Sequence, residues 1–140
     1  MNTNAIVRIS DENPSYSSMP VATRAEKVAF YNAVENPKHK LSSFINKKIK
    51  FSNVYMEQVN IAERDEDGEP TGVMNTTVKT VLITPEGDGI LSTSMGVARS
   101  LYAMFQIFGT PDTWAPDDPM IVEVKQVEIG KNRTFKLEVC

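Results

Sequence analysis

The 140-residue sequence is poor in the side chains that build disulfides, metal centres and hydrolytic sites. It has one cysteine, Cys140, which cannot form an internal disulfide and therefore agrees with a reducing compartment. Its one histidine, His39, has no companion at the spacing of metal ligands and no partner for a Ser-His-Asp arrangement. We therefore expect no metal and no cofactor, and we expect that the protein is not an enzyme.

Long hydrophobic runs are also missing. No stretch approaches the roughly 18 uncharged apolar residues that a membrane helix needs, and the N-terminus lacks a basic segment followed by an apolar one. We expect a cytoplasmic protein without a membrane segment or signal peptide. Hydrophobic residues make up 41% of the chain, which is enough for one core. The Asn-, Ser- and Pro-rich residues 1–22 indicate a flexible arm, and residues 23–140 indicate a single domain.

Two segments have the signals of helices. Thr23 and Glu26 form a capping-box pattern that predicts a helix over residues 24–35, ended by Pro37. A second helix is predicted from Gly96 to residue 108, with a stripe of large apolar side chains at helical spacing. The stripe consists of Val97, Leu101, Met104, Phe105 and Phe108.

The remaining periodic segments predict strands at residues 46–61, 73–84, 90–94, 120–129 and 133–139. Three strands, a helix and two strands is the order of the oligonucleotide/oligosaccharide-binding (OB) barrel, in which the helix between strands 3 and 4 covers one end. We therefore expect a mainly β protein with a five-stranded OB barrel and an additional N-terminal helix. In such barrels ligands lie across strands 2 and 3, between the loop after strand 1 and the loop before strand 5.

Charge is distributed unevenly along this acidic chain, whose net charge is −3. Residues 24–61 carry seven basic and three acidic groups (+4), whereas residues 62–90 carry two basic and seven acidic groups (−5). Such segregation suits a localised binding face, although charge also fluctuates by a few units in any sequence of this length.

Three segments resemble the small single-stranded-DNA-binding proteins of tailed phages that infect Gram-positive bacteria and prime replication with a protein. They are HKLSSFINKKIKFSNVYMEQV (39–59), TVLITPEGDGILSTSMGVARSLYAMFQIFGTPDTW (80–114) and VEVKQVEIGKNRTFKLEV (122–139). The resemblance implies an OB protein that coats single-stranded DNA during viral replication in the host cytoplasm, alone or with phage replication proteins. The chain departs from the bacterial homotetrameric proteins because it has no acidic, Pro- and Gly-rich C-terminal tail with an aromatic tip.

A sequence-tolerant single-strand binder needs cations for phosphates and exposed rings for bases. Eight residues on the expected strands and loops meet this description: Lys47, Lys48, Lys50, Tyr55, Lys79, Lys125, Lys131 and Arg133. Tyr55 is preferred over Phe51, which we expect in the core, because its hydroxyl tolerates water. The same lysines also fit a solvated strand edge that discourages aggregation.

Trp114 is surrounded by Asp112, Asp117 and Asp118, which repel phosphate, so we expect it to anchor the lower end of the barrel. The acidic turn at residues 63–69 should face away from DNA or contact a partner protein. A protein-docking or regulatory module of a phage is therefore the alternative to a DNA coat protein.

Overall fold

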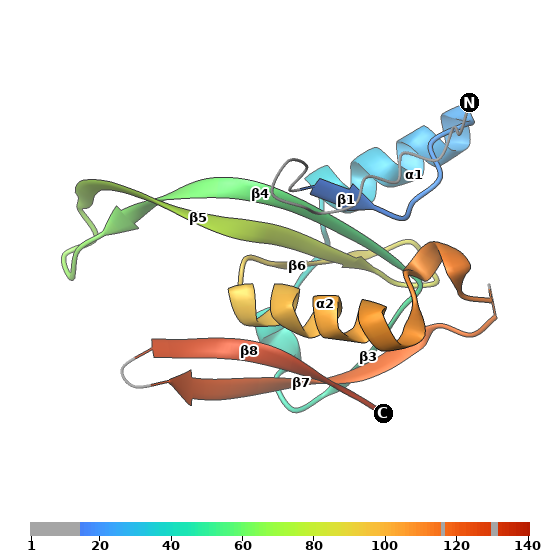
Figure 1. The fold of residues 1–140 in the computed structure, drawn as a ribbon. Helices are drawn as coiled ribbons and strands as arrows, with labels where there is room; N and C mark the ends of the chain where they lie inside the picture. Colours follow the sequence, from blue (N-terminus) through green and yellow to red (C-terminus); the bar gives the residue numbers. More distant parts are fainter. Residues whose placement is uncertain (1–14, 116, 130–131) are drawn as a thin grey trace.

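The computed structural model describes residues 15–115, 117–129 and 132–140, and its mainly β architecture confirms the expected class. The strands form two sheets (Figure 1). The five-stranded sheet has the order β1 (Ser15–Ser17), β4 (Asn53–Arg64), β5 (Pro70–Ile83), β6 (Gly89–Ser92) and β2 (His39–Lys40). The three-stranded sheet has the order β3 (Lys48–Phe51), β7 (Met120–Ile129) and β8 (Asn132–Val139).

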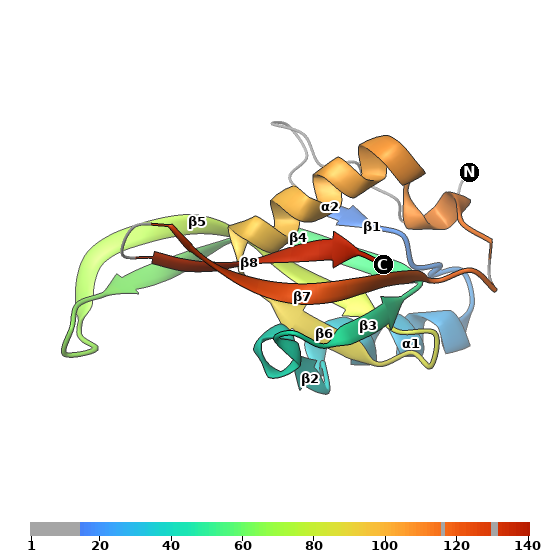
Figure 2. The same ribbon diagram turned by 90° about the horizontal axis from the view of Figure 1, so that it is seen from below.

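The two sheets share one bent stretch of chain. The expected first strand is divided at Ser52, so that β3 pairs with β7 while β4 pairs with β5. Ser52 keeps its backbone satisfied at the bend by donating its N–H to the carbonyl of Ile83 at 2.9 Å. The strands therefore follow one another in space as β8, β7, β3 continuing into β4, β5 and β6 (Figure 2).

The described strands do not close into the barrel that we expected, because β6 and β8 are not hydrogen-bonded neighbours. The N-terminal end of α2 (Met95–Phe108) lies along the free edge of β8 instead. Ser94 Oγ accepts the N–H of Phe135 at 3.3 Å, and Ser100 Oγ accepts the N–H of Leu137 at 3.1 Å. These two hydroxyl groups satisfy edge amides that a ladder between β6 and β8 would otherwise have paired.

The main core lies between the two sheets and α2. The buried positions of α2 include Val97, Leu101 and Met104, as the apolar stripe predicted, and they meet Phe51 and Val54 from the bend. Phe108 does not continue the stripe, since it is 46% exposed at the end of α2. Residue 108 is the last residue of α2, directly before the cap residue Gly109.

A second, smaller cluster lies on the outer side of the five-stranded sheet, under α1 (Arg24–Glu35). The predicted capping box at Thr23 and Glu26 is confirmed, since each side chain accepts the backbone N–H of the other residue. Ala33 packs against the sheet so closely that a Cβ on Gly89 would lie 2.3 Å from its carbonyl oxygen. Helix α1 is thus docked on the sheet and is part of the domain.

The expected flexible arm over residues 1–22 does not extend to residue 22. Residues 15–17 form β1 on the edge of the sheet beside β4, and Tyr16 and Met19 are buried. Ser18 Oγ accepts the N–H of Val54 at 2.9 Å, which ties this segment to the core. Residues 1–14 lie outside the described residues. The buried side chains of Tyr16 and Met19 therefore hold this Ser- and Pro-rich segment on the sheet.

A short helix, η2 (Pro111–Thr113), connects α2 to the last two strands. Trp114 follows it and packs against Phe51, with 5.8 Å between the ring centroids, while its Nε1 donates to the carbonyl of Phe108 at 3.1 Å. These contacts support the interpretation of Trp114 as an anchor.

Candidate nucleic-acid interface

The three-stranded sheet gathers three of the predicted cations on its outer face. Along β3, Ile49 and Phe51 are buried, whereas Lys48 and Lys50 alternate with them and are exposed. Lys48 lies opposite Glu123 and Lys50 opposite Ile121, so Lys125, two residues beyond Glu123, projects from the same face. Lys47 is exposed directly before β3. The structure therefore brings Lys48, Lys50 and Lys125 to one face of the sheet, and Lys47 is next to them in the chain.

The charges on this face are only partly compensated. Lys125 forms an ion pair with Glu123, and this contact with Lys125, helped by the charge of Lys48, lowers the pKa of the Glu123 carboxyl. The same contact raises the pKa of Lys125. Lys136, opposite Lys125 on β8, lies 3.6 Å from Glu138. Within the part of the chain that the structure describes, Lys47, Lys48 and Lys50 have no ion pair, so they carry the available positive charge.

Tyr55 and Lys79 lie on the other sheet and do not join these lysines. The Tyr55 ring contacts Phe30 of α1 edge-on, with 5.7 Å between centroids. Burial, followed by the nearby Glu57 and then Glu35, raises the pKa of the Tyr55 hydroxyl to about 12. Lys79 lies opposite Glu57 across the β4–β5 ladder. Helix α1 packs on this side of the five-stranded sheet, and the Tyr55 ring is partly buried against Phe30. Tyr55 stays a predicted stacking ring that lies apart from the lysines of β3.

The predicted closing hairpin is described only in part. Lys131 lies outside the described residues, as does most of the GKN turn. Arg133 belongs to β8, where it pairs with Glu128 in the ladder, but its side chain is not among those described.

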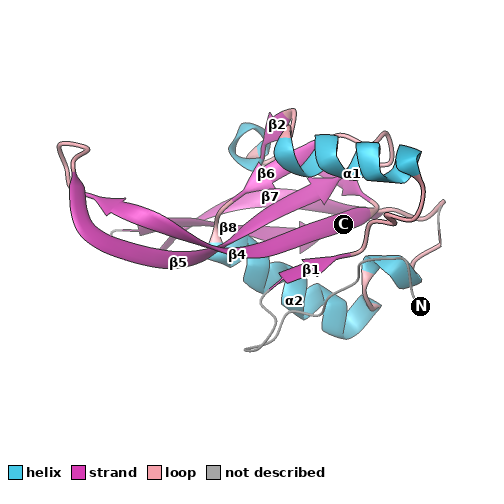
Figure 3. Ribbon diagram, turned by 90° about the horizontal axis from the view of Figure 1, so that it is seen from above, coloured by secondary structure: helices cyan, strands magenta, loops and turns pink. Residues whose placement is uncertain are grey.

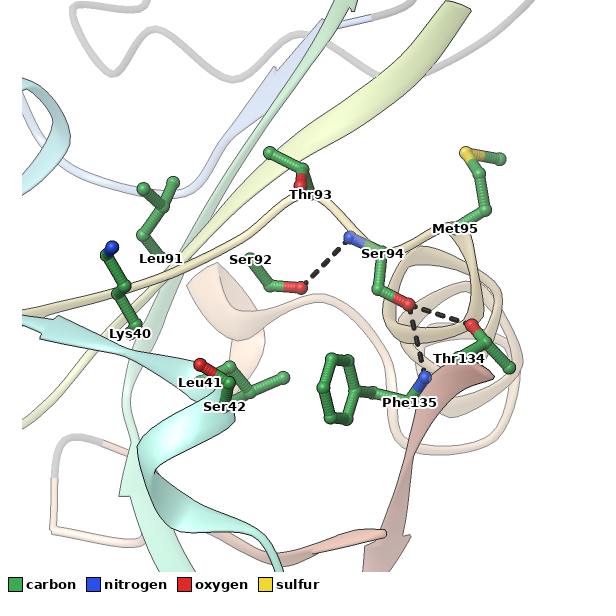
Figure 4. Close-up of a pocket in the computed structure, with 10 residues that line it drawn as sticks. All are labelled: Lys40, Leu41, Ser42, Leu91, Ser92, Thr93, Ser94, Met95, Thr134 and Phe135. Atoms are coloured by element: carbon green, nitrogen blue, oxygen red, sulfur yellow. Dashed lines mark hydrogen bonds between the residues drawn. The ribbon is translucent and has the colours of Figure 1, made fainter. Parts of the chain in front are cut away.

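The opening between β6 and β8 forms a cavity of about 460 Å³ that the sequence did not reveal (Figure 4). It is half-open, and aromatic, hydroxyl and cationic groups from three stretches of the chain, residues 40–42, 91–95 and 134–135, line it. The groups with functional interest are Lys40, Ser42, Thr93, Ser94, Thr134 and Phe135. Figure 4 shows the Phe135 ring directed into the space between Leu41 and Ser42 on one side and Ser94 on the other.

Hydrogen bonds fix the wall of this cavity next to Phe135. Ser94 N donates to Ser92 Oγ at 3.1 Å, and Ser94 Oγ lies 2.9 Å from Thr134 Oγ1. Lys40 and Thr93 remain exposed at the rim. A flat ring with polar edges could stack on Phe135 and hydrogen-bond at this wall, while an attached anion could meet Lys40.

The cavity adjoins the basic face through a short piece of chain. Lys40 ends β2, the short helix η1 (Leu41–Phe44) follows, and Lys47 directly precedes β3, which begins at Lys48 (Figure 2). The backbone of Asn46 and Lys47 is hydrogen-bonded to Val124 of β7, which holds this connection against the three-stranded sheet. Sequence signals for the two missed residues existed: Lys40 belongs to the basic run that starts at Lys38, and Phe135 alternates with Leu137 on a strand.

A second cavity of about 480 Å³ lies at the other end of α2, lined by Tyr16, Tyr102, Phe105 and neighbouring polar groups. The Tyr16 hydroxyl donates to Asp112 Oδ1 at 3.2 Å. A carboxylate so close to the aromatic wall disfavours a phosphate there. The cavity between β6 and β8 is therefore the better candidate for a nucleotide.

Within the described ranges no group of three or more side chains could hold a metal ion. No helix among these residues is long and apolar enough to cross a membrane. No protein-family model, curated protein or solved structure matches the chain.

Proposed function

We propose that the protein binds single-stranded DNA without sequence preference, as a phage coat protein that protects single strands during viral replication. The phage assignment rests on the resemblance of residues 39–59, 80–114 and 122–139. The fold is then an open form of the OB barrel, with α2 between the third and fourth strands. The bent segment shared by both sheets and the spatial order of the five main strands support this reading.

The cavity with Phe135 and Lys40, next to the unpaired lysines of β3, is the observation that carries the proposal. A single strand presents unstacked bases and a line of phosphates at the same time. Phe135 would stack on a base at the cavity, and Lys40, Lys47 and Lys48 would neutralise phosphates that leave it along η1 and β3. A duplex hides its bases, so it would meet only the lysines and bind more weakly.

The direct test measures the fluorescence anisotropy of labelled oligo-dT and of a duplex of equal length at several salt concentrations. We expect tighter binding of the single strand and an affinity that falls with salt, since phosphate contacts release counterions. No binding of oligo-dT at low salt would retire the proposal. If the duplex bound as tightly as the single strand, base stacking would not contribute to the affinity.

Two variants locate the site. Phe135→Leu keeps an apolar side chain against the core but removes the ring, so single-strand affinity should fall by about 1–3 kcal/mol, or about 5- to 150-fold. Phe30→Leu, an equal change on α1, is the control and should leave affinity unchanged. Lys48→Ala with Lys50→Ala should weaken binding and flatten its salt dependence, whereas Lys27→Ala on α1 should not. If Phe135→Leu binds like the parent, bases do not stack in this cavity.

A further inference from the structure

Strands β4 and β5 continue beyond the body of the protein as a two-stranded arm. The pairing of β1 with β4 ends at Glu57, and the pairing of β6 with β5 ends at Thr80. Residues 58–64 and 70–79 therefore pair only with each other, and we call residues 58–79 the arm. The arm projects from the body in all three ribbon views (Figures 1, 2 and 3).

An isolated two-stranded ribbon is at best marginally stable in water, because neither face is covered. The arm adds exposed apolar surface to this problem: Val73 is 48% and Met74 is 59% exposed. Both side chains lie near the tip of the ribbon, where the register between β4 and β5 shifts, and they leave its apolar surface uncovered. A partner that covers the ribbon would stabilise its two strands and remove the exposed apolar side chains from water.

The charge of the arm determines what kind of partner it fits. Its distal part carries five carboxylates, Glu63, Asp65, Glu66, Asp67 and Glu69, against the single cation Arg64. Asp65 Oδ1 accepts the backbone N–H groups of Asp67 and Glu69, and Arg64 Nη1 donates to the carbonyl of Gly68. The turn is thus held from within, while Glu66 and Asp67 stay exposed to meet cations on a partner.

The outer face of the three-stranded sheet has the complementary properties. Lys47, Lys48 and Lys50 supply uncompensated positive charge, and the partly exposed Ile121 and Val127 lie among the charged side chains of β7. This face therefore offers cations for the acidic tip and apolar contacts for Val73 or Met74. In Figure 2 the arm extends away from β3 of its own chain, so the contact needs another molecule.

We propose that the arm of one copy docks on the outer face of the three-stranded sheet of a second copy. The two surfaces are different, so the contact is heterologous, and it either closes by reciprocal exchange or grows into open chains. The contact needs no nucleic acid, so it is tested on the protein alone.

Sedimentation velocity at low salt, over a range of protein concentrations, gives the association constant of the full chain. The tip variant Glu66→Lys with Asp67→Lys and the face variant Lys48→Glu with Lys50→Glu should each weaken self-association by at least about tenfold, because attraction becomes repulsion. Combining all four substitutions in one chain restores opposite charges and should recover most of the association. Arg24→Glu with Lys27→Glu on α1 matches the charge change of the face variant and should have no comparable effect.

Recovery in the fourfold variant supports the docking, because a misfolded tip or sheet could not be rescued by reversing the other surface. A parent chain that stays monomeric at low salt and high concentration would overturn the proposal. It would equally fail if the α1 control weakened association as much as the face variant, since net charge would then explain the result.

Discussion

The contact between α2 and β8 allows a sharp prediction at Gly96. Glycine in a helix is normally replaced by alanine with a gain of up to about 1 kcal/mol, because alanine restricts the unfolded chain and favours helix. Here a Cβ would lie 2.1 Å from the carbonyl oxygen of Phe135 and 2.5 Å from Thr134 Oγ1. The first of these atoms is backbone and cannot turn away, so the helix or the strand must move.

The free-energy cost of that movement follows from the contacts between α2 and β8. Inserting one carbon into a packed site costs about 1–3 kcal/mol. Shifting α2 from β8 also lengthens the hydrogen bond from Phe135 N to Ser94 Oγ and the contact of Ser94 Oγ with Thr134 Oγ1, each worth about 1 kcal/mol. Against a propensity gain of less than about 1 kcal/mol, Gly96→Ala should lower the free energy of unfolding by about 2–4 kcal/mol.

Urea unfolding followed by circular dichroism measures this change. Ala103→Gly, at an exposed position of the same helix, is the control for propensity and should cost about 1 kcal/mol. Gly96→Ala should therefore destabilise the protein more than the control does. Helix propensity alone would predict the opposite order, because it favours Ala over Gly at both positions. A Gly96→Ala protein that is as stable as the parent would refute the close packing of α2 on β8.

Two further predictions concern buried polar groups. Thr80 is fully buried, and its Oγ1 has no hydrogen-bond partner within the described part of the chain. Thr80→Val should therefore stabilise the protein by about 1 kcal/mol in urea unfolding. The control Thr77→Val removes the hydrogen bond from Thr77 Oγ1 to the Thr93 carbonyl and should destabilise the protein. Burial raises the pKa of Tyr16, Tyr55 and Tyr102, that of Tyr55 to about 12, so the folded state holds these protons more tightly than the unfolded chain. The free energy of unfolding should therefore fall between about pH 10 and 12, and it should fall less in Tyr55→Phe. A free energy of unfolding that does not change over this pH range would contradict the burial of these hydroxyls.

Local signals predicted the elements whose structure depends on neighbouring residues. The capping box at Thr23 and Glu26, the end of α1 before Pro37 and most of the α2 stripe follow from spacing alone. The divided first strand did not follow, because residues 48–64 contain no proline or glycine that would mark the bend at Ser52. The one local signal is a shift of the buried apolar positions from Ile49 and Phe51 to Val54 and Met56. The bend is decided by the two different strands, β7 and β5, that pair on either side of it.

The candidate site was harder to predict because alternation shows that a strand has two faces but not what covers each of them. The preference for Tyr55 as an outward-facing ring rests on its hydroxyl, and the structure places Tyr55 between Val54 and Met56, which are buried in the main core. It does face outward, but α1 docks there, since Gly89 lets Ala33 approach the sheet. Tyr55 therefore lies partly buried beside α1, whereas the lysines of β3, on the other sheet, are exposed.

The uneven charge along the sequence becomes a separation in space. The acidic residues 63–69 lie at the end of the arm, while Lys47, Lys48 and Lys50 lie on the body, on a sheet that α1 does not cover. Such a polar molecule would attract a polyanion to one side only, and it would attract the acidic arm of another copy to that same side. If both proposals hold, single-stranded DNA and the arm compete for Lys48 and Lys50, so oligo-dT should dissociate the copies at low salt. Oligo-dT that instead binds without changing the sedimentation of the protein would separate the two surfaces and assign these lysines to only one of them.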